Sequence, residues 1–257
     1  MNRIDEIFKK RTEKVIPFFT AGYPSKESMV DIVLAAEKAG ADMIELGMPF
    51  SDPLADGPII QESSQIAIRN GVDISWILAS VESIRKESQI PLVLMGYINP
   101  IIKYGMAKFF VECNKVGVDG LIIPDLPPEE AEFFNQEAAR FNIAIIFLVA
   151  PNTSNERIKK ISNISGSLIY CVAILGITGS DGANKKQLLD YLKRVESYSS
   201  CPFIVGFGIK NRKDIIEINK MAHGAVVGTA IIEKIQSSSD PVRVVREYIG
   251  SLTGRNI

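Results

Sequence analysis

Eight short apolar runs recur along this chain, and each is followed by a stretch with the spacing of an amphipathic helix. Several runs are continuously apolar, as expected for parallel strands that are covered by protein on both faces. Parallel neighbours need a long crossover, so every strand must return to the sheet through a helix. The predicted strands are 15–20, 43–46, 92–95, 120–123, 144–149, 168–172, 203–205 and 225–227.

Helices are predicted between these strands, and no linker rich in serine or proline divides the chain. We therefore expect residues 1–257 to form a single α/β domain, a (β/α)₈ TIM barrel with an extra N-terminal helix. An open, doubly wound sheet is the alternative. In a barrel, the active site lies in the loops that follow the strands. The predicted helices are 28–39, 74–87, 106–116, 129–140, 155–164, 186–197, 212–221, 229–236 and 242–252.

Composition narrows the class of protein. Hydrophobic residues make up 46% of the 257, which is enough for a large core, and the net charge of −1 gives no basic surface for nucleic acid. The longest apolar run, 143–150, is too short to cross a bilayer, and the N-terminus lacks the apolar region of a signal peptide. We expect a cytoplasmic protein that does not bind membranes.

The cysteines and the histidine argue against metal chemistry. Cys113, Cys171 and Cys201 are widely separated and have neither metal-ligand nor redox spacing. His223 is the only histidine, so a transition-metal site would have few ligands. We expect no metal, and we expect the three cysteines to be structural thiols.

An acidic segment, 45–58, follows the second predicted strand. It carries the carboxylates Glu45, Asp52 and Asp56 together with three prolines and two glycines, and it contains no lysine or arginine. A stiff, uncharged backbone at a strand end can hold acids in fixed positions for proton transfer. The alternative is an ordinary proline-rich surface turn.

Glycines follow the last two strands. The segment 206–208 reads Gly-Phe-Gly, and Gly228-Thr229 stands where a short helix is predicted to begin. Close backbone approach and a helix N-terminus favour an anion, and barrels often hold phosphate after these strands. A third polar loop, with Thr178 and Gly179, follows strand six. These glycines predict a phosphate site, although a lone Gly-X-Gly is more often a tight turn.

Other chemistries lack their residues. No lysine stands at a strand end to form a Schiff base, and no GxSxG nucleophile elbow is present. Carboxylate acid–base chemistry on a phosphorylated substrate remains.

The chain resembles the α subunit of tryptophan synthase over essentially its whole length. The acidic segment 45–58, ELGMPFSDPLADGP, matches the signature of that family almost residue for residue. Further matches follow in the same order, at 17–24, 118–125, 176–179 and 206–209. The resemblance implies retro-aldol cleavage of indole-3-glycerol phosphate into indole and glyceraldehyde 3-phosphate, a step of tryptophan biosynthesis.

The resemblance also assigns roles. Glu45 would be the principal acid and base, and Asp56 would accept a hydrogen bond from the indole N–H. Asp52 would face the partner subunit, with a catalytic role as the alternative. The implied substrate-binding residues are Phe18, Tyr97, Ile122, Tyr170, Thr178 and Phe207, and the implied phosphate-binding residues are Gly179, Gly208, Gly228 and Thr229. Aromatic and aliphatic residues at these positions are also ordinary barrel core.

A partner is implied as well. Family members work as an αββα complex, and indole passes to a β subunit that carries pyridoxal phosphate, so no cofactor is expected in this chain. The regions around Pro53, Asn99-Pro100 and Pro127 would contact the β subunit, and the loop 175–184 would act as a lid. The chain departs from the family pattern at 173–175. Two other functions remain open: a regulatory subunit that does not catalyse, and another phosphosugar barrel such as an isomerase.

Overall fold

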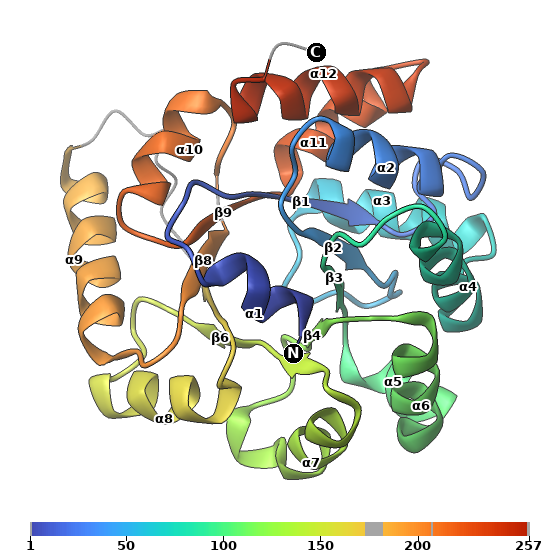
Figure 1. Ribbon diagram of the computed structural model, residues 1–257. Helices are drawn as coiled ribbons and strands as arrows, with labels where there is room; N and C mark the ends of the chain where they lie inside the picture. Colours follow the sequence, from blue (N-terminus) through green and yellow to red (C-terminus); the bar gives the residue numbers. More distant parts are fainter. Residues whose placement is uncertain (1, 173–181, 207, 256–257) are drawn as a thin grey trace.

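The computed structural model describes residues 2–172, 182–206 and 208–255, except for the side chains of 182–185. Parallel strands form the centre and helices surround them as a ring (Figure 1). The described strands are β1 (Val15–Thr20), β2 (Ile44–Gly47), β3 (Leu92–Met95), β4 (Gly120–Ile122), β5 (Ala144–Ile145), β6 (Phe147–Val149), β7 (Ile169–Val172), β8 (Phe203–Gly206) and β9 (Gly224–Val227). The described helices are α1 (Arg3–Phe8), α2 (Met29–Lys38), α3 (Pro58–Arg69), α4 (Ile74–Arg85), α5 (Ile98–Tyr104), α6 (Met106–Val116), the 3₁₀ helix η1 (Pro128–Glu130), α7 (Glu132–Phe141), α8 (Asn155–Ser165), α9 (Gly182–Tyr198), α10 (Arg212–Asn219), α11 (Thr229–Gln236) and α12 (Pro241–Thr253).

The sheet closes through its fifth predicted strand. Its strand order is β5-β4-β3-β2-β1-β9-β8-β7-β6, and the two terminal strands are separated by a single residue. Ala144 pairs with Gly120 on one side, and Phe147 pairs with Ile169 on the other. The segment 144–149 therefore belongs to both edges. The prediction of a (β/α)₈ barrel is confirmed, and the alternative of an open doubly wound sheet is wrong.

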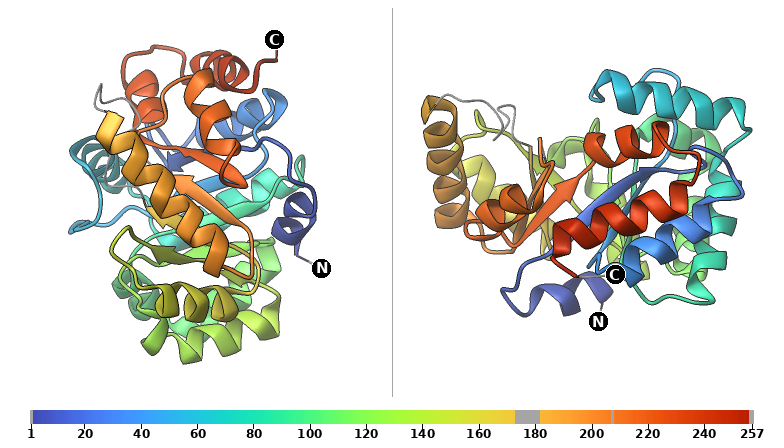
Figure 2. Two further views of the ribbon diagram at one scale, coloured as in Figure 1. Left: turned by 90° about the vertical axis from the view of Figure 1, so that its left-hand side faces the viewer. Right: turned by 90° about the horizontal axis from the view of Figure 1, so that it is seen from above.

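Alternate strand residues point into the barrel and form an inner core. This core includes Ile16 and Phe18 of β1 and Val93 of β3, while a larger core lies between the strands and the helices. Ile4 and Phe8 of α1 join the inner core from one end. Figure 2 shows α1 at one end of the barrel and the loop that leads into α3 at the opposite end. The N-terminal helix therefore closes the bottom and leaves the other end for a site.

Charged groups tie α1 to the bottom of the barrel. The buried carboxylate of Asp119 lies 2.9 Å from Arg3 Nη1 and 2.7 Å from Arg85 Nη2. The same carboxylate accepts from the backbone N–H of Leu92 at 2.8 Å. Asn2 caps α1 and donates to the Asp119 carbonyl at 2.7 Å. A buried pair with this many hydrogen bonds resists opening, so this network stabilises the bottom of the barrel.

Two helices were not predicted from the sequence. The helix α3 begins with Gly57 as N-cap and Pro58 in its first turn, which is a favourable start because proline has no N–H to leave unpaired. The helix α5 begins at Ile98, whose N–H is accepted by Asp125 Oδ1 at 3.0 Å. Both segments contain a proline, and neither was among the predicted helices. The predicted helix 129–140 is divided into η1 and α7.

Candidate active site

Glu45 lies inside the barrel on β2. It pairs in register with Phe18 on β1, and its exposed fraction is 0%. Within the described part of the chain, neither of its carboxylate oxygens has a hydrogen-bond partner. Burial without a compensating charge disfavours the ionised form and raises the pKa of Glu45 from 4.5 to about 8. A carboxyl group that is protonated at neutral pH can serve as a general acid.

Asp56 lies in the loop between β2 and α3, where three hydrogen bonds hold its backbone neighbourhood. The Asp56 N–H donates to the Pro53 carbonyl at 3.4 Å, and Gln61 Nε2 donates to the Asp56 carbonyl at 2.8 Å. The Tyr97 hydroxyl accepts from the Ala55 N–H at 2.9 Å. Burial raises the pKa of Asp56, while the nearby Tyr97 hydroxyl lowers it. The loop thus presents a partly buried carboxyl beside a phenol.

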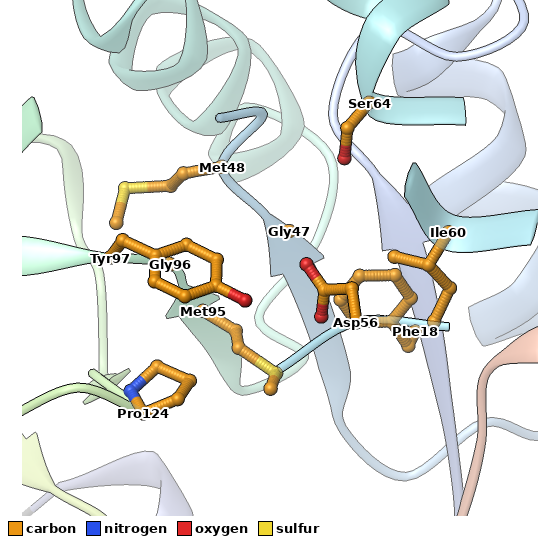
Figure 3. Close-up of a pocket in the computed structure, with 10 residues that line it drawn as sticks. All are labelled: Phe18, Gly47, Met48, Asp56, Ile60, Ser64, Met95, Gly96, Tyr97 and Pro124. Carbon is orange, nitrogen blue, oxygen red and sulfur yellow. The ribbon is translucent and has the colours of Figure 1, made fainter. Parts of the chain in front are cut away.

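A small cavity brings together predicted residues from three parts of the chain, Phe18, Asp56 and Tyr97. Figure 3 shows the carboxyl of Asp56 next to the ring of Phe18, with the Tyr97 hydroxyl directed toward it. Side chains two positions apart on a strand share one face, so Glu45 lies one layer below Gly47 in this wall. The cavity is lined by Phe18, Gly47, Met48, Asp56, Ile60, Ser64, Met95, Gly96, Tyr97 and Pro124.

Glycines make room for the aromatic residues at the barrel mouth. A Cβ on Gly47 would lie 2.4 Å from Phe18 Cζ, and one on Gly206 would lie 1.8 Å from the Tyr170 hydroxyl oxygen. Tyr170 is buried, and burial raises its pKa well above the usual value, with further contributions from the charges of Glu45 and Asp56. The phenol of Tyr170 therefore lies in the electrostatic range of both carboxyl groups. Each ring depends on the glycine of the neighbouring strand.

Two of the glycines predicted to bind phosphate, Gly208 and Gly228, also lie at this end of the barrel. Gly208 follows β8 with a φ of 64°, and Gly228 is the N-cap of α11, which begins at Thr229. A Cβ on Gly228 would lie 3.8 Å from Phe18 Cβ and from the end of the Ile60 side chain. The N-terminus of α11 therefore borders the cavity wall. The first turn of a helix offers unpaired N–H groups and a dipole that favours an anion.

The remaining predicted residues divide into two groups. Ile122 ends β4, is fully buried and belongs to the inner core of the barrel. Thr178, Gly179 and Phe207 lie outside the described residues, as do positions 173–175 and the predicted lid up to residue 181.

Several cavity residues were missed in the sequence. Ile60 and Ser64 stand four positions apart on α3, so they share one face of a helix that was not predicted. The Gly-Pro start at 57–58 was the available signal. Met48 and Met95 gave no signal, because methionine after or within an apolar strand is ordinary core.

No group of three or more His, Cys, Asp or Glu side chains that could hold a metal ion occurs among the described residues. His223 immediately precedes β9, and its Nδ1 accepts from the Phe203 N–H at 3.3 Å. This hydrogen bond gives the histidine a structural role in joining two strands.

A closed parallel barrel with two carboxyl-bearing residues, Glu45 and Asp56, on and after one strand has the architecture of the barrel enzymes, whose active sites lie at the carboxyl ends of the strands. The family model described as "Tryptophan synthase alpha chain" matches residues 4–252. The chain therefore belongs to the tryptophan synthase alpha chain family.

Individual relatives and solved structures support the same family assignment. The tryptophan synthase alpha chain of Thermoanaerobacter sp. (strain X514) is 46% identical over 259 residues, covering 98% of both chains. That of Petrotoga mobilis is 44% identical over 240 residues, covering 93% of both. A crystal structure of the alpha subunit from Legionella pneumophila has a TM-score of 0.92 at 33% identity, covering 99% of this chain and 98% of that one. A structure of the tryptophan synthase a2b2 complex from Pyrococcus furiosus has a TM-score of 0.89 at 36% identity, covering 94% and 98%.

Proposed function

We propose that Glu45 and Asp56 are the acid–base pair with which this chain cleaves indole-3-glycerol phosphate, the reaction of its family. The observation that carries this proposal is the carboxyl of Glu45. It is fully buried, its pKa is raised to about 8, and it lies one layer below the cavity that Asp56 lines. The products are indole and glyceraldehyde 3-phosphate.

Glu45 supplies the proton that the reaction needs at carbon 3 of the indole ring. Protonation there leaves the ring positively charged at nitrogen and weakens the bond to the glycerol side chain. The resulting Glu45 carboxylate then takes the proton of the adjacent side-chain hydroxyl while the carbon–carbon bond breaks and its electrons return to the ring. Glu45 is thereby restored to its protonated form, so one buried residue can be both acid and base.

Asp56 would accept a hydrogen bond from the indole N–H, where positive charge develops. A carboxylate placed at that position before the reaction stabilises the charge without further reorganisation. The Tyr97 hydroxyl favours the ionised form of Asp56, because it lowers a pKa that burial raises. Burial raises the pKa of both carboxyl groups, but only at Asp56 does a neighbouring hydroxyl oppose the rise, so the two groups are suited to different tasks.

The rest of the predicted site binds the two ends of the substrate. Phe18 and Tyr97 would pack on the indole ring, and Ile122 and Tyr170 would close the barrel interior below it. The N-terminus of α11 with Thr229 would hold the phosphate, together with the other phosphate-binding residues predicted above, Gly179, Gly208 and Gly228. The position of the α11 N-terminus supports this assignment of the phosphate, because Gly228 lies close to Phe18 and Ile60 in the cavity wall.

A partner subunit would dock beside the cavity. A wider, more open hollow shares Tyr97 and Pro124 with the cavity and is lined also by Asp52, Leu54 and Asn99. Leu54 is 95% exposed, so this surface offers apolar contacts to a β subunit in an α₂β₂ tetramer. We propose that pyridoxal phosphate belongs to that subunit.

We propose a cytoplasmic location and one catalytic domain. The three cysteines are free thiols, which is typical of a reducing compartment. No helix among the described residues is long and apolar enough to cross a membrane.

Indole release by the isolated chain tests the two roles. Glu45→Gln and Asp56→Asn should each lower kcat by at least about a hundredfold, the usual range for a general acid or base. Asp52→Asn is the matched control, because Asp52 is exposed on the same loop. Parent-like turnover by Glu45→Gln would remove Glu45 from its role and favour a subunit that only regulates its partner.

A further inference from the structure

The loop that carries Asp56 is held by few contacts, although the reaction needs this carboxyl in one place. The turn from Pro53 to Asp56 presents Leu54 almost completely to solvent. Little apolar burial therefore fixes the turn, and loops of this kind open at low free-energy cost. The turn depends instead on a small number of polar contacts.

Gln61 supplies the contacts that connect this turn to a rigid element. Its side-chain Nε2 donates to the Asp56 carbonyl at 2.8 Å and lies 3.4 Å from the Pro53 carbonyl. Its own backbone N–H donates to the Gly57 carbonyl at 3.0 Å, which starts the hydrogen bonding of α3. One residue thus joins the first helical turn to both ends of the turn that contains Asp56.

Tyr97 contacts the same turn from the other side of the cavity. Its hydroxyl accepts from the Ala55 N–H at 2.9 Å, and its ring lies 5.2 Å from that of Phe50. A hydroxyl that accepts from the backbone keeps its own hydrogen available for the Asp56 carboxyl. Two groups therefore fix the position of Asp56: Tyr97 contacts its side chain, and Gln61 holds its backbone.

We propose that Gln61 is a positioning residue, which holds the Asp56 backbone so that the carboxyl faces the cavity. This inference rests on the proposed function of Asp56. Gln61 does not act on the substrate itself, since its amide is directed to backbone carbonyls. Its loss should slow the chemical step without weakening substrate binding, because the phosphate and the ring are held elsewhere.

The test compares Gln61→Met with Gln65→Met. Methionine matches glutamine in length but has no donor, and Gln65 is exposed one turn further along the same helix. Gln61→Met should lower kcat for indole release roughly tenfold and leave KM within about twofold, as expected for a misplaced catalytic group. It should also speed amide hydrogen exchange in peptides that cover 53–56, measured without substrate. Gln65→Met should leave kcat, KM and the exchange over 53–56 unchanged.

Parent-like kcat, or parent-like exchange, in a folded Gln61→Met protein would overturn the inference. A parallel rise in KM and fall in kcat, or a general increase in exchange over α3, would overturn it too, because either result indicates a structural role only. Asp56→Asn, measured alongside, separates the two proposals. If that variant turns over like the parent, the role of Asp56 fails, while the exchange data still decide whether Gln61 holds the loop.

Discussion

Replacing Glu45 by glutamine should stabilise the protein at neutral pH while it abolishes turnover. The folded protein holds this carboxyl in full burial, which raises its pKa from 4.5 to about 8. In the unfolded chain the carboxyl is in water and ionises near 4.5. Glutamine has almost the same shape and carries no charge at any pH, so it removes the ionisation and little else.

The magnitude follows from the two pKa values. A raised pKa means that the stability contributed by protonated Glu45 is fully present below pH 4.5 and declines as the pH rises toward the folded pKa of about 8. Each pH unit in this window removes about 1.4 kcal/mol, because only the unfolded chain releases the proton. At pH 7 the loss is about 3 kcal/mol, which is a large share of the stability of an ordinary domain.

Urea unfolding at several pH values, from about 4.5 to about 8, measures this effect. Glu45→Gln and the parent should have similar stability at the lowest pH and should diverge by about 3 kcal/mol at pH 7. Glu82→Gln, an exposed glutamate on α4, is the control and should follow the parent. Parallel curves for Glu45→Gln and the parent would refute the reasoning, since they would mean that the fold accepts the ionised carboxylate.

Two further predictions concern the ends of the barrel. Gly206→Ala should cost about 1–3 kcal/mol of unfolding free energy, because its Cβ would meet the buried Tyr170 hydroxyl. In a double-mutant cycle, Tyr170→Leu should remove more than half of that cost, and additive effects would contradict the predicted clash. Asp119→Ala should cost about 3 kcal/mol in urea unfolding, because it leaves the guanidinium of Arg85 buried without its carboxylate. The kcat per folded molecule should stay unchanged. A loss of stability under about 1 kcal/mol would show that the pair contributes little.

The strand segments were predictable because a buried parallel strand needs a continuous apolar run, whatever surrounds it. The runs at 15–20 and 92–95 match β1 and β3 at both ends. Helices α3 and α5 were not predicted, although each has a proline near its start. In both helices it lies in the first turn, where its missing N–H leaves nothing unpaired. That error also hid Ile60 and Ser64, which line the cavity.

The sequence by itself determined the class of fold and the chemical groups available. The alternation of strands and helices demanded a parallel sheet, and the acidic segment at a strand end supplied the carboxyl groups of Glu45, Asp52 and Asp56. Tertiary structure alone decided how these groups differ. Closure of the barrel buries Glu45 without a partner and raises its pKa, while Asp56 stays on a loop beside Tyr97. Burial and neighbouring polar groups depend on residues far apart in the chain, so no local pattern could have shown that Glu45 is buried without a partner while Asp56 has one.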